Sequence, residues 1–387
     1  MLAGEGVRTV QTFGVPDEET LSVAADAEAV VVSLKSRSIP AEEAVARSLG
    51  ALRALEQLGA RQVQFKYCST FDSTPEGNIG PVVSVLMDAL QTDYTVAVPA
   101  LPVNGRTQYM GYLFVNGTLL SESPMRYHPL NPMTESNLVR HLQAQTSRRV
   151  GLIDLHSVRN VSFERSQGVE IALVDAIDDT DLRSIATAVA DDPLITGGSG
   201  ISQALPAVWK KKGLWERSAP EVCGTRRTVR RTLMLSGSCS TATLRQVGQW
   251  HGPSVRMNPA ELGPREFNRL IDFCLASWEH NPEVLVYSSA EPGARTEGAA
   301  KAVEAAFAEI ARTLLGRYEQ VVTTGGETSG AVIEALGVRA VEIGPRIDPG
   351  IPALRSIAGP RLVLALKSGN FGSDNFFAKA TQSLLSV

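Results

Sequence analysis

Apolar strands alternate with amphipathic helices along almost the whole chain, and this alternation limits the folds it can adopt. Residues 29–34 (AVVVSL) form a continuous apolar run, and residues 41–60 then carry apolar side chains at helical spacing. The same strand-then-helix order recurs in both halves of the sequence. Such alternation predicts an α/β fold in which mostly parallel sheets are flanked by helices on both faces.

At 387 residues, the chain is too long for one compact core, so we expect two domains. Residues 210–231 are rich in charge and lack periodicity, which is typical of a linker. We therefore predict a first domain at residues 1–205, a linker at 206–230, a second domain at 231–387 and a ligand cleft between the domains. Strands are expected at residues 7–13, 29–34, 63–67, 94–98, 150–155, 170–176, 232–235, 284–288, 320–324, 340–343 and 362–366. Helices are expected at residues 41–60, 82–90, 241–250, 260–278, 298–315 and 327–336.

The charge balance and the cysteines exclude several classes of protein. Lys and Arg total 37 against 41 Asp and Glu, which argues against binding to nucleic acid or to a membrane surface. No apolar run approaches the ~18 residues that span a bilayer. Scattered single cysteines suit a reducing cytoplasm. Neither the cysteines nor the histidines have metal-ligand spacing, so the sequence identifies no metal ligands.

Three glycine-rich loops follow predicted strands of the second half. Each would lie at the carboxyl end of its strand, where ligands bind in open α/β sheets. Glycine lets backbone N–H groups approach an anion, and a helix N-terminus adds unpaired donors. Turn and capping chemistry is the alternative for any single loop, so the prediction of a phosphate-rich ligand depends on all three lying together. The candidate residues are Ser236, Ser238, Gly325, Gly326, Glu327, Thr328, Gly369 and Asn370.

Polar and basic side chains also follow predicted strands of the first half. A small hydroxylated acid needs a cation for its carboxylate and polar partners for its hydroxyl groups. Loop structure and capping are the alternative roles for these residues. The candidate cations are Lys35, Arg37, Lys66 and Arg106, the candidate hydroxyl partners are Asp72, Asn78 and Asn104, and Ser69, Thr70 and Ser73 from the loop around Asp72 complete the set.

The common nucleotide motifs GxxxxGK[ST], GxGxxG and HRD are absent, so a bound nucleotide would need a different loop.

Seven short segments form a more specific pattern. They are residues 65–82 (FKYCSTFDSTPEGNIGPV), 99–117 (PALPVNGRTQYMGYLFVNG), 128–138 (HPLNPMTESNL), 196–200 (TGGSG), 235–240 (LSGSCS), 324–330 (TGGETSG) and 366–372 (LKSGNFG). In this order they resemble the four-carbon acid sugar kinase family, and the resemblance runs from about residue 7 to the C-terminus.

The resemblance implies an N-terminal sugar-acid domain and a C-terminal domain that binds ATP. Because phosphoryl transfer depends on charge stabilisation, we also expect Mg²⁺ between the phosphates. It implies transfer of the γ-phosphoryl group of ATP to the 4-hydroxyl of 3-oxo-tetronate. By this resemblance, ATP would contact Ser236, Ser238, residues 325–328 and Gly369. The substrate would contact residues 72–80 and 104–106. Asp72 is one candidate for the proton acceptor, and the aspartate pair of the family's N-terminal acidic segment is the other. Glu327 is a candidate for a contact to Mg²⁺ or ribose, with helix capping as its alternative role.

One departure from the family pattern affects the expected activity. The family usually opens with an acidic ADDFTGA-like segment and a helix, and this sequence begins near the end of that helix. The resemblance therefore implies weakened or absent activity in the chain as written, and restoring the upstream segment should raise turnover. A non-catalytic protein that binds sugar acid and nucleotide is one alternative, and a dehydrogenase, which would need a complete GxGxxG, is another. The sequence does not determine the oligomeric state, and a homo-oligomer is one of the possible states.

Overall fold

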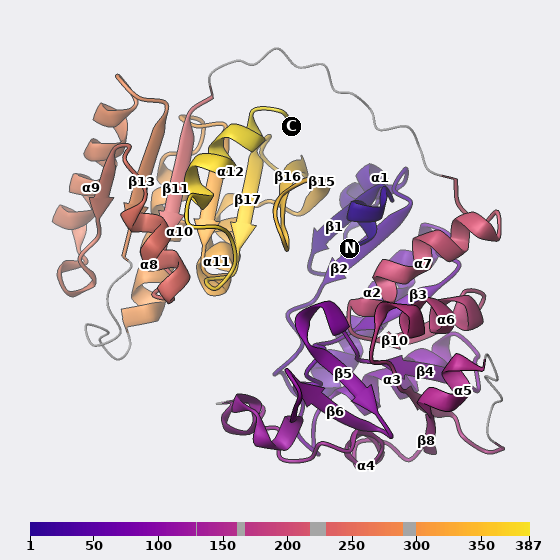
Figure 1. The fold of residues 1–387 in the computed structure, drawn as a ribbon. Coiled ribbons are helices and arrows are strands. Elements are labelled where there is room, and N and C mark those ends of the chain that lie inside the picture. Colours follow the sequence, from indigo (N-terminus) through magenta and orange to yellow (C-terminus); the bar gives the residue numbers. More distant parts are fainter. Residues whose placement is uncertain (129, 161–166, 217–229, 289–298) are drawn as a thin grey trace. The chain divides into compact units, whose positions relative to one another are not determined.

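The structure is a computed structural model that describes residues 1–128, 130–160, 167–216, 230–288 and 299–387 (Figure 1). Contacts between Cα atoms divide the chain into two compact units. The first unit comprises residues 1–7, 14–17 and 32–218, and the second comprises residues 8–13, 18–31 and 219–387.

A five-stranded parallel sheet forms the centre of the first unit, in the order β3-β10-β4-β9-β8 (Figure 1). Every residue of β4, β9 and β10 is buried, because helices cover both faces of the sheet. One face packs against α2 and α3, and the other packs against α6 and α7. The elements are β3 (Val63–Lys66), β4 (Thr95–Val98), β8 (Val150–Ile153), β9 (Ile171–Val174), β10 (Leu194–Gly197), α2 (Ala41–Gln57), α3 (Ile79–Ala89), α6 (Asp179–Val189) and α7 (Gly200–Lys211).

A small antiparallel sheet, β5-β6-β7, lies beside the carboxyl end of β9. The fully buried Asp175 follows β9, and its carboxylate accepts from the N–H groups of Met110 at 2.6 Å and Gly111 at 3.0 Å in the β5–β6 turn. Burial raises the pKa of Asp175, and these hydrogen bonds lower it. The sequence alone did not identify Asp175 as the residue that holds the β5–β6 turn. The other elements of the unit are η1 (Leu2–Glu5), η2 (Pro102–Asn104), β5 (Arg106–Tyr109), β6 (Tyr112–Val115), β7 (Thr118–Leu119), η3 (Leu120–Glu122), η4 (Pro124–Tyr127), α4 (Leu138–Gln143) and α5 (Leu155–Arg159).

A nine-stranded mixed sheet forms the second unit, in the order β12-β13-β11-β14-β17-β16-β15-β1-β2. The first five strands in that order run parallel, whereas β16 pairs antiparallel with β17 and β15, and β15 pairs antiparallel with β1. The strands are β1 (Thr9–Phe13), β2 (Ala29–Ser33), β11 (Thr232–Ser236), β12 (Ser254–Arg256), β13 (Glu283–Tyr287), β14 (Gln320–Thr324), β15 (Ala340–Asp348), β16 (Ile351–Ala358) and β17 (Val363–Lys367).

Helices cover both faces of this larger sheet (Figure 1). One apolar core joins the sheet to α9, α10 and α11, and the other joins it to α12 and the end of α8. The prediction of mostly parallel sheets flanked by helices is therefore confirmed. The helices are α1 (Glu18–Ala24), α8 (Thr241–Gly248), η5 (Pro259–Glu261), α9 (Pro264–Ser277), α10 (Ala299–Thr313), α11 (Gly326–Leu336) and α12 (Phe376–Leu384).

The first two strands join a different sheet from the one expected. The sequence placed residues 7–13 and 29–34 in the first domain, but β1 and β2 extend the sheet of the second unit. The reason is a long-range pairing, in which Val10 lies opposite Glu342 and Thr12 opposite Ala340. A local apolar pattern identifies a strand but carries no information about its partner.

Two other boundaries also differ from the prediction. The linker expected at 206–230 starts inside α7, which continues to Lys211, and residues 217–229 lie outside the described ranges. The helix expected at 260–278 begins as α9 at Pro264, because proline suits the first helical turn, and a short η5 precedes it. Residue 298, the expected start of α10, is also outside the described ranges.

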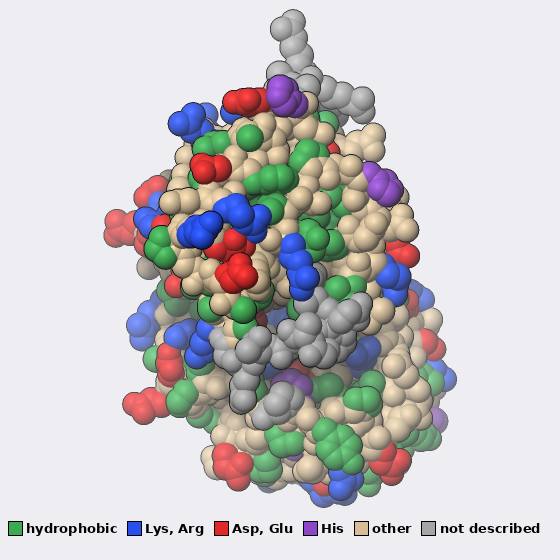
Figure 2. All heavy atoms as spheres, turned by 90° about the vertical axis from the view of Figure 1, so that its left-hand side faces the viewer, with side chains coloured by type: hydrophobic (Ala, Val, Ile, Leu, Met, Phe, Trp, Pro, Cys, Tyr) green, Lys and Arg blue, Asp and Glu red, His purple; other side chains and the backbone are tan. Residues whose placement is uncertain are grey.

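Charged side chains of both signs are interspersed on the face of the molecule shown in Figure 2. On the face shown in Figure 2, Lys and Arg side chains lie among Asp and Glu side chains without forming an extended patch of one sign among the described residues. This distribution agrees with the net charge of −4. Within the described part of the chain, no helix is both long enough and apolar enough to cross a membrane.

Candidate functional site

The three glycine-rich loops leave one edge of the second unit's sheet from adjacent strands. β11, β14 and β17 are neighbours in parallel register, with Ser236 opposite Thr324 and Thr324 opposite Lys367. The hydroxyl oxygens of Ser236 and Thr324 lie 2.7 Å apart. The loops therefore begin at the same level of the sheet, which is the arrangement that a shared phosphate site requires.

Glycine is required where these loops touch one another. A Cβ atom on Gly237 would lie 2.1 Å from Thr328 Oγ1, and one on Gly369 would lie 2.2 Å from Ser238 Oγ. Gly325 has a φ of +112°, which other residues rarely adopt. A side chain at Gly237 or Gly369 would collide with a hydroxyl of the neighbouring loop, so glycine lets these loops pack against one another.

The two serines predicted to contact ATP differ in accessibility. Ser236 is fully buried, and its hydroxyl is paired with Thr324 inside the sheet. Ser238 is partly exposed, and its hydroxyl accepts from the N–H of Ser240 at 3.2 Å. The geometry favours Ser238 over Ser236 as a side-chain contact, and both assignments remain predictions.

The N-terminus of α11 lies beside these loops, and its first backbone N–H groups have no hydrogen-bond partner within the described ranges. Gly325 is the N-cap, and Gly326 and Glu327 in the first turn are exposed, whereas Thr328 is buried. The first N–H groups of a helix have no partner within the helix and favour an anion. Burial raises the pKa of Glu304 on α10, the charge of the Glu327 carboxylate raises it further, and Lys301 lowers it.

Sequence reasoning missed Lys367, the last residue of β17. Its side chain is 3% exposed, and its Nζ donates to Thr243 Oγ1 at 3.1 Å, the Ser368 carbonyl at 3.2 Å and the Gly369 carbonyl at 3.1 Å. Burial lowers the pKa of Lys367 to about 8. A lysine at the end of an otherwise apolar strand, directly before a glycine-rich loop, was the available sequence signal.

The loop that follows β17 is also held by hydrogen bonds at its far end, around residues 371–373. Gln246 Nε2 on α8 donates to the carbonyls of Phe371, Gly372 and Ser373 at 3.0–3.1 Å. Asp348 at the end of β15 accepts from the backbone N–H of Ser373 at 2.9 Å and from its hydroxyl at 2.8 Å. The loop is therefore a fixed feature of the folded unit.

In the first unit, the structure brings together three of the predicted charged residues. Arg37 Nη1 donates to the Asp72 carboxylate at 3.0 Å, and the Thr70 hydroxyl donates to the same carboxylate. The Asp72 side chain is 4% exposed, whereas that of Arg37 is 53% exposed and can reach a ligand. The Lys66 side chain reaches solvent, yet the protein packed around it lowers the pKa by desolvation. Arg37 lowers this pKa further, and Cys68 and Asp72 raise it. Two cations beside one buried carboxylate leave an excess of positive charge for an organic anion.

Asn78 and Ser73 use their side chains inside the protein. Asn78 Nδ2 donates to the carbonyls of Ser36 at 2.7 Å and Ile39 at 3.1 Å, so it holds the loop that carries Arg37. Ser73 is buried, and its hydroxyl accepts from Gln145 Nε2 at 2.9 Å. Substrate contacts predicted for these two residues remain predictions.

Replacing Asn78 by Ala should loosen the loop that carries Arg37. We expect the free energy of unfolding to fall by about 1–3 kcal/mol, because the part-buried hydrogen bonds from Asn78 to the carbonyls of Ser36 and Ile39 are lost. Chemical denaturation measures this loss. Asn104→Ala is the matched control, since Asn104 is exposed and its loss should change stability by less than about 0.5 kcal/mol. Equal stabilities of the two variants would contradict the anchoring role.

No recorded contact among the described residues joins Asn104 or Arg106 to Asp72. Arg106 donates to the Asn104 carbonyl, and its Nε is buried without a partner among the described residues. A buried unsatisfied donor favours a ligand contact. Lys35 has a φ of +50°, and Ser69 is partly exposed beside Gly198, where a Cβ atom would lie 3.5 Å from the Ser69 Cα.

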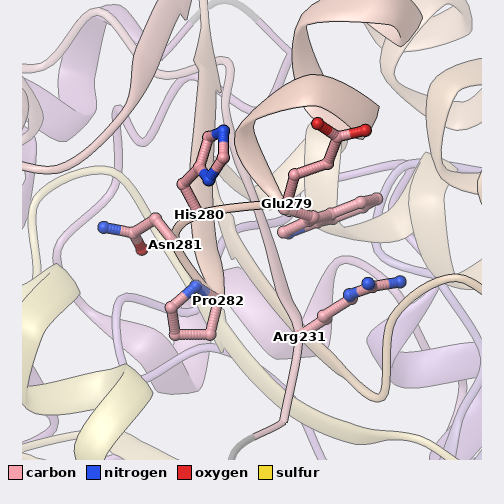
Figure 3. Close-up of a pocket in the computed structure, with 6 residues that line it drawn as sticks. Arg231, Glu279, His280, Asn281 and Pro282 are labelled. Atoms are coloured by element: carbon pink, nitrogen blue, oxygen red, sulfur yellow. The ribbon is translucent and has the colours of Figure 1, made fainter.

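A cavity of about 260 Å³ lies at the opposite edge of the larger sheet. Figure 3 shows Arg231 ahead of β11, and Glu279, His280, Asn281 and Pro282 between α9 and β13. These residues precede the amino ends of the two strands, whereas the glycine-rich loops follow carboxyl ends. None of the predicted site residues lines this cavity, and we assign it no function.

Comparison with known families covers most of the chain. Residues 1–205 match a sugar-binding N-terminal domain, and residues 233–377 match a nucleotide-binding C-terminal domain. This chain belongs to the four-carbon acid sugar kinase family. The resemblance inferred from seven short segments is thereby confirmed.

Curated members of the family are similar over nearly their whole length. The 3-oxo-tetronate kinase of Cupriavidus necator is 44% identical over 409 aligned positions, which cover 99% of this chain and 93% of that protein. The 3-oxo-tetronate kinase of Burkholderia multivorans is 46% identical, with the same coverage of each chain.

Solved structures of family members share the fold. A crystal structure of a Haemophilus influenzae protein matches with a TM-score of 0.86 and 39% identity, over 99% of this chain and 96% of that one. A Salmonella typhimurium protein matches with the same TM-score and identity, over 99% and 95% of the respective chains.

Proposed function

We propose that this protein is an ATP-dependent kinase that phosphorylates the 4-hydroxyl of 3-oxo-tetronate. The observation that carries the proposal is the emergence of three glycine-rich loops from adjacent strand ends, with the N-terminus of α11 among them. Backbone N–H groups in such a setting bind phosphate. The family membership and the names of the relatives support the same activity.

The proposed acid site is the group formed by Arg37, Lys66 and Asp72. The two cations would bind the carboxylate of the substrate, Arg37 through two parallel N–H groups and Lys66 as a point charge. The excess positive charge around Asp72 supports this assignment. Arg106, with its unsatisfied buried Nε, would add a further donor.

In the reaction, the 4-hydroxyl oxygen forms a bond to the γ-phosphorus of ATP, and the bond from that phosphorus to ADP breaks. The proton of the hydroxyl passes to a base, for which we propose Asp72. Orientation of the acid and stabilisation of the charge on the transferred group supply most of the rate in such reactions, and little covalent chemistry is left for the protein.

We propose that Glu327 would contact the Mg²⁺ that accompanies ATP in kinases. Mg²⁺ keeps several waters and takes one or two carboxylates besides the phosphates. Glu327, a carboxylate exposed at the N-terminus of α11, fits that requirement. The ion would neutralise phosphate charge. A cytoplasmic location follows from the proposed use of ATP, and a homo-oligomer remains a prediction.

A coupled assay of ADP release tests the proposed activity. We expect the highest turnover with 3-oxo-tetronate among four-carbon acids, and phosphorus NMR should show phosphate on the 4-oxygen of the product. Reactions without acid measure background ATP hydrolysis. ATP binding without ADP release from any acid would instead support the non-catalytic alternative, which the names of the relatives do not favour.

A further inference from the structure

The charge of Lys367 is buried without a neutralising acid. Its side chain is 3% exposed, and among the described residues no carboxylate lies within ion-pair distance of its Nζ. The ring of Phe376, whose centroid is 5.6 Å from the Nζ, offers only weak compensation. A buried charge of this kind is costly unless another group in the functional complex neutralises it.

The hydrogen bonds of Lys367 set the direction of the following backbone. Its Nζ binds the carbonyl oxygens of Ser368 and Gly369, and the Gly369 carbonyl also accepts from Thr243 Oγ1 at 2.9 Å and Ser240 Oγ at 2.6 Å. In a trans peptide, the C=O and the next N–H point in opposite directions, and no described peptide is cis.

The N–H groups of Gly369 and Asn370 therefore point away from the lysine. Neither group has a recorded partner among the described residues, and Asn370 is exposed. Two successive outward N–H groups form a concave anion site. The loop thus presents free donors on the side opposite a buried cation.

We infer that Lys367 is the positioning residue of the nucleotide site, which turns the N–H groups of Gly369 and Asn370 toward a phosphate of ATP and places a positive charge behind them. This inference rests on the proposed function and adds a residue that acts through the backbone. All three donors of Lys367 bind protein atoms. Lys367 therefore need not touch the nucleotide itself.

The lowered pKa of Lys367 makes this role measurable. Because this pKa is about 8, Lys367 loses its charge in a pH range in which ATP binding can be measured. A bound phosphate favours the charged form, so ATP binding should raise this pKa and take up protons near pH 9. ATP affinity should then fall as pH rises through the pKa.

Other titratable or charged groups lie on the elements that surround Lys367. They are Cys239, Arg245, Glu327, Asp348, Asp374 and Lys379, of which Arg245 pairs with Asp374 and Asp348 pairs with Lys379.

The variant Lys367→Met tests the inference by calorimetric titration with ATP in the absence of any acid. We expect ATP to bind about tenfold or more weakly at pH 7, because a charge and the carbonyl anchors are lost. The midpoint of thermal unfolding should not fall, since a buried unpaired charge is removed. The difference in ATP affinity between wild type and variant should shrink as pH rises above the pKa of the lysine.

Proton uptake supplies a readout that a merely structural lysine would not change. Titrations of the wild type at pH 9, in two buffers of different ionisation enthalpy, should show uptake of up to one proton on ATP binding, and Lys367→Met should abolish it. Cys239→Ser and Lys379→Met are the controls and should retain the uptake. Absence of uptake in the wild type would overturn the inference, even if the variant does not fold. Proton-linked ATP binding without ADP release would count against the proposed kinase activity. It would still support the positioning role of Lys367.

Discussion

Replacement of Asp72 by Asn is expected to lower kcat about 10²- to 10⁴-fold, because the proposed base is lost. The amide can still accept from Thr70 and lie against Arg37, so the local structure should persist. Arg37 is 53% exposed, which leaves its charge hydrated when the carboxylate is removed. Steady-state ADP release measures kcat, and thermal unfolding confirms that the variant is folded.

Two further variants separate chemistry from binding at this site. Glu56→Gln changes an exposed acid on α2, outside the proposed site, and should leave kcat within about twofold of the wild type. Arg37→Met removes a cation proposed to bind the substrate carboxylate, so it should raise the KM for the acid more than it lowers kcat. Wild-type kcat in Asp72→Asn would exclude Asp72 as the base.

Replacement of Gly326 by Asp should weaken ATP binding about 100-fold, which corresponds to ~3 kcal/mol of charge repulsion within a few ångströms of a phosphate. Gly326 is the first residue of α11, and a Cβ there would meet no atom within 4 Å. An acid at this position also suits the helix dipole. The fold should therefore remain intact while the helix N-terminus becomes occupied by a negative charge. Calorimetric titration with ATP measures the loss.

Gly326→Asn is the matched control, because it adds nearly the same volume without a charge. We expect its ATP affinity to lie between those of the wild type and Gly326→Asp, and high salt should reduce the difference between the two variants. If Gly326→Asp binds ATP as tightly as Gly326→Asn does, the N-terminus of α11 is not part of the phosphate site.

Most strands could be placed from local sequence alone. The run at residues 320–324 was predicted with the bounds that β14 has, and the strands before the other two glycine-rich loops were placed to within one residue. A strand covered on both faces must be apolar along its length, so a run of consecutive apolar residues identifies its position. Glycines at the strand ends then marked the candidate phosphate loops, because few other residues allow such close backbone contacts.

Pairing partners and side-chain roles could not be predicted in this way. The antiparallel strand β16 and the membership of β1 in the larger sheet depend on contacts between distant segments, such as Val10 with Glu342. Whether Asn78 faces a ligand or anchors a loop depends on the carbonyls that the fold brings near it.

The sequence alone determined the α/β class, the family and the loops that follow the carboxyl ends of the parallel strands, because these properties are encoded in short contiguous segments. Only the tertiary structure decided that Ser236 is enclosed, that Arg37 pairs with Asp72 and that Lys367 is buried beneath the Gly369 carbonyl. The physical reason is that burial and hydrogen bonding of a side chain depend on neighbours that are remote in sequence.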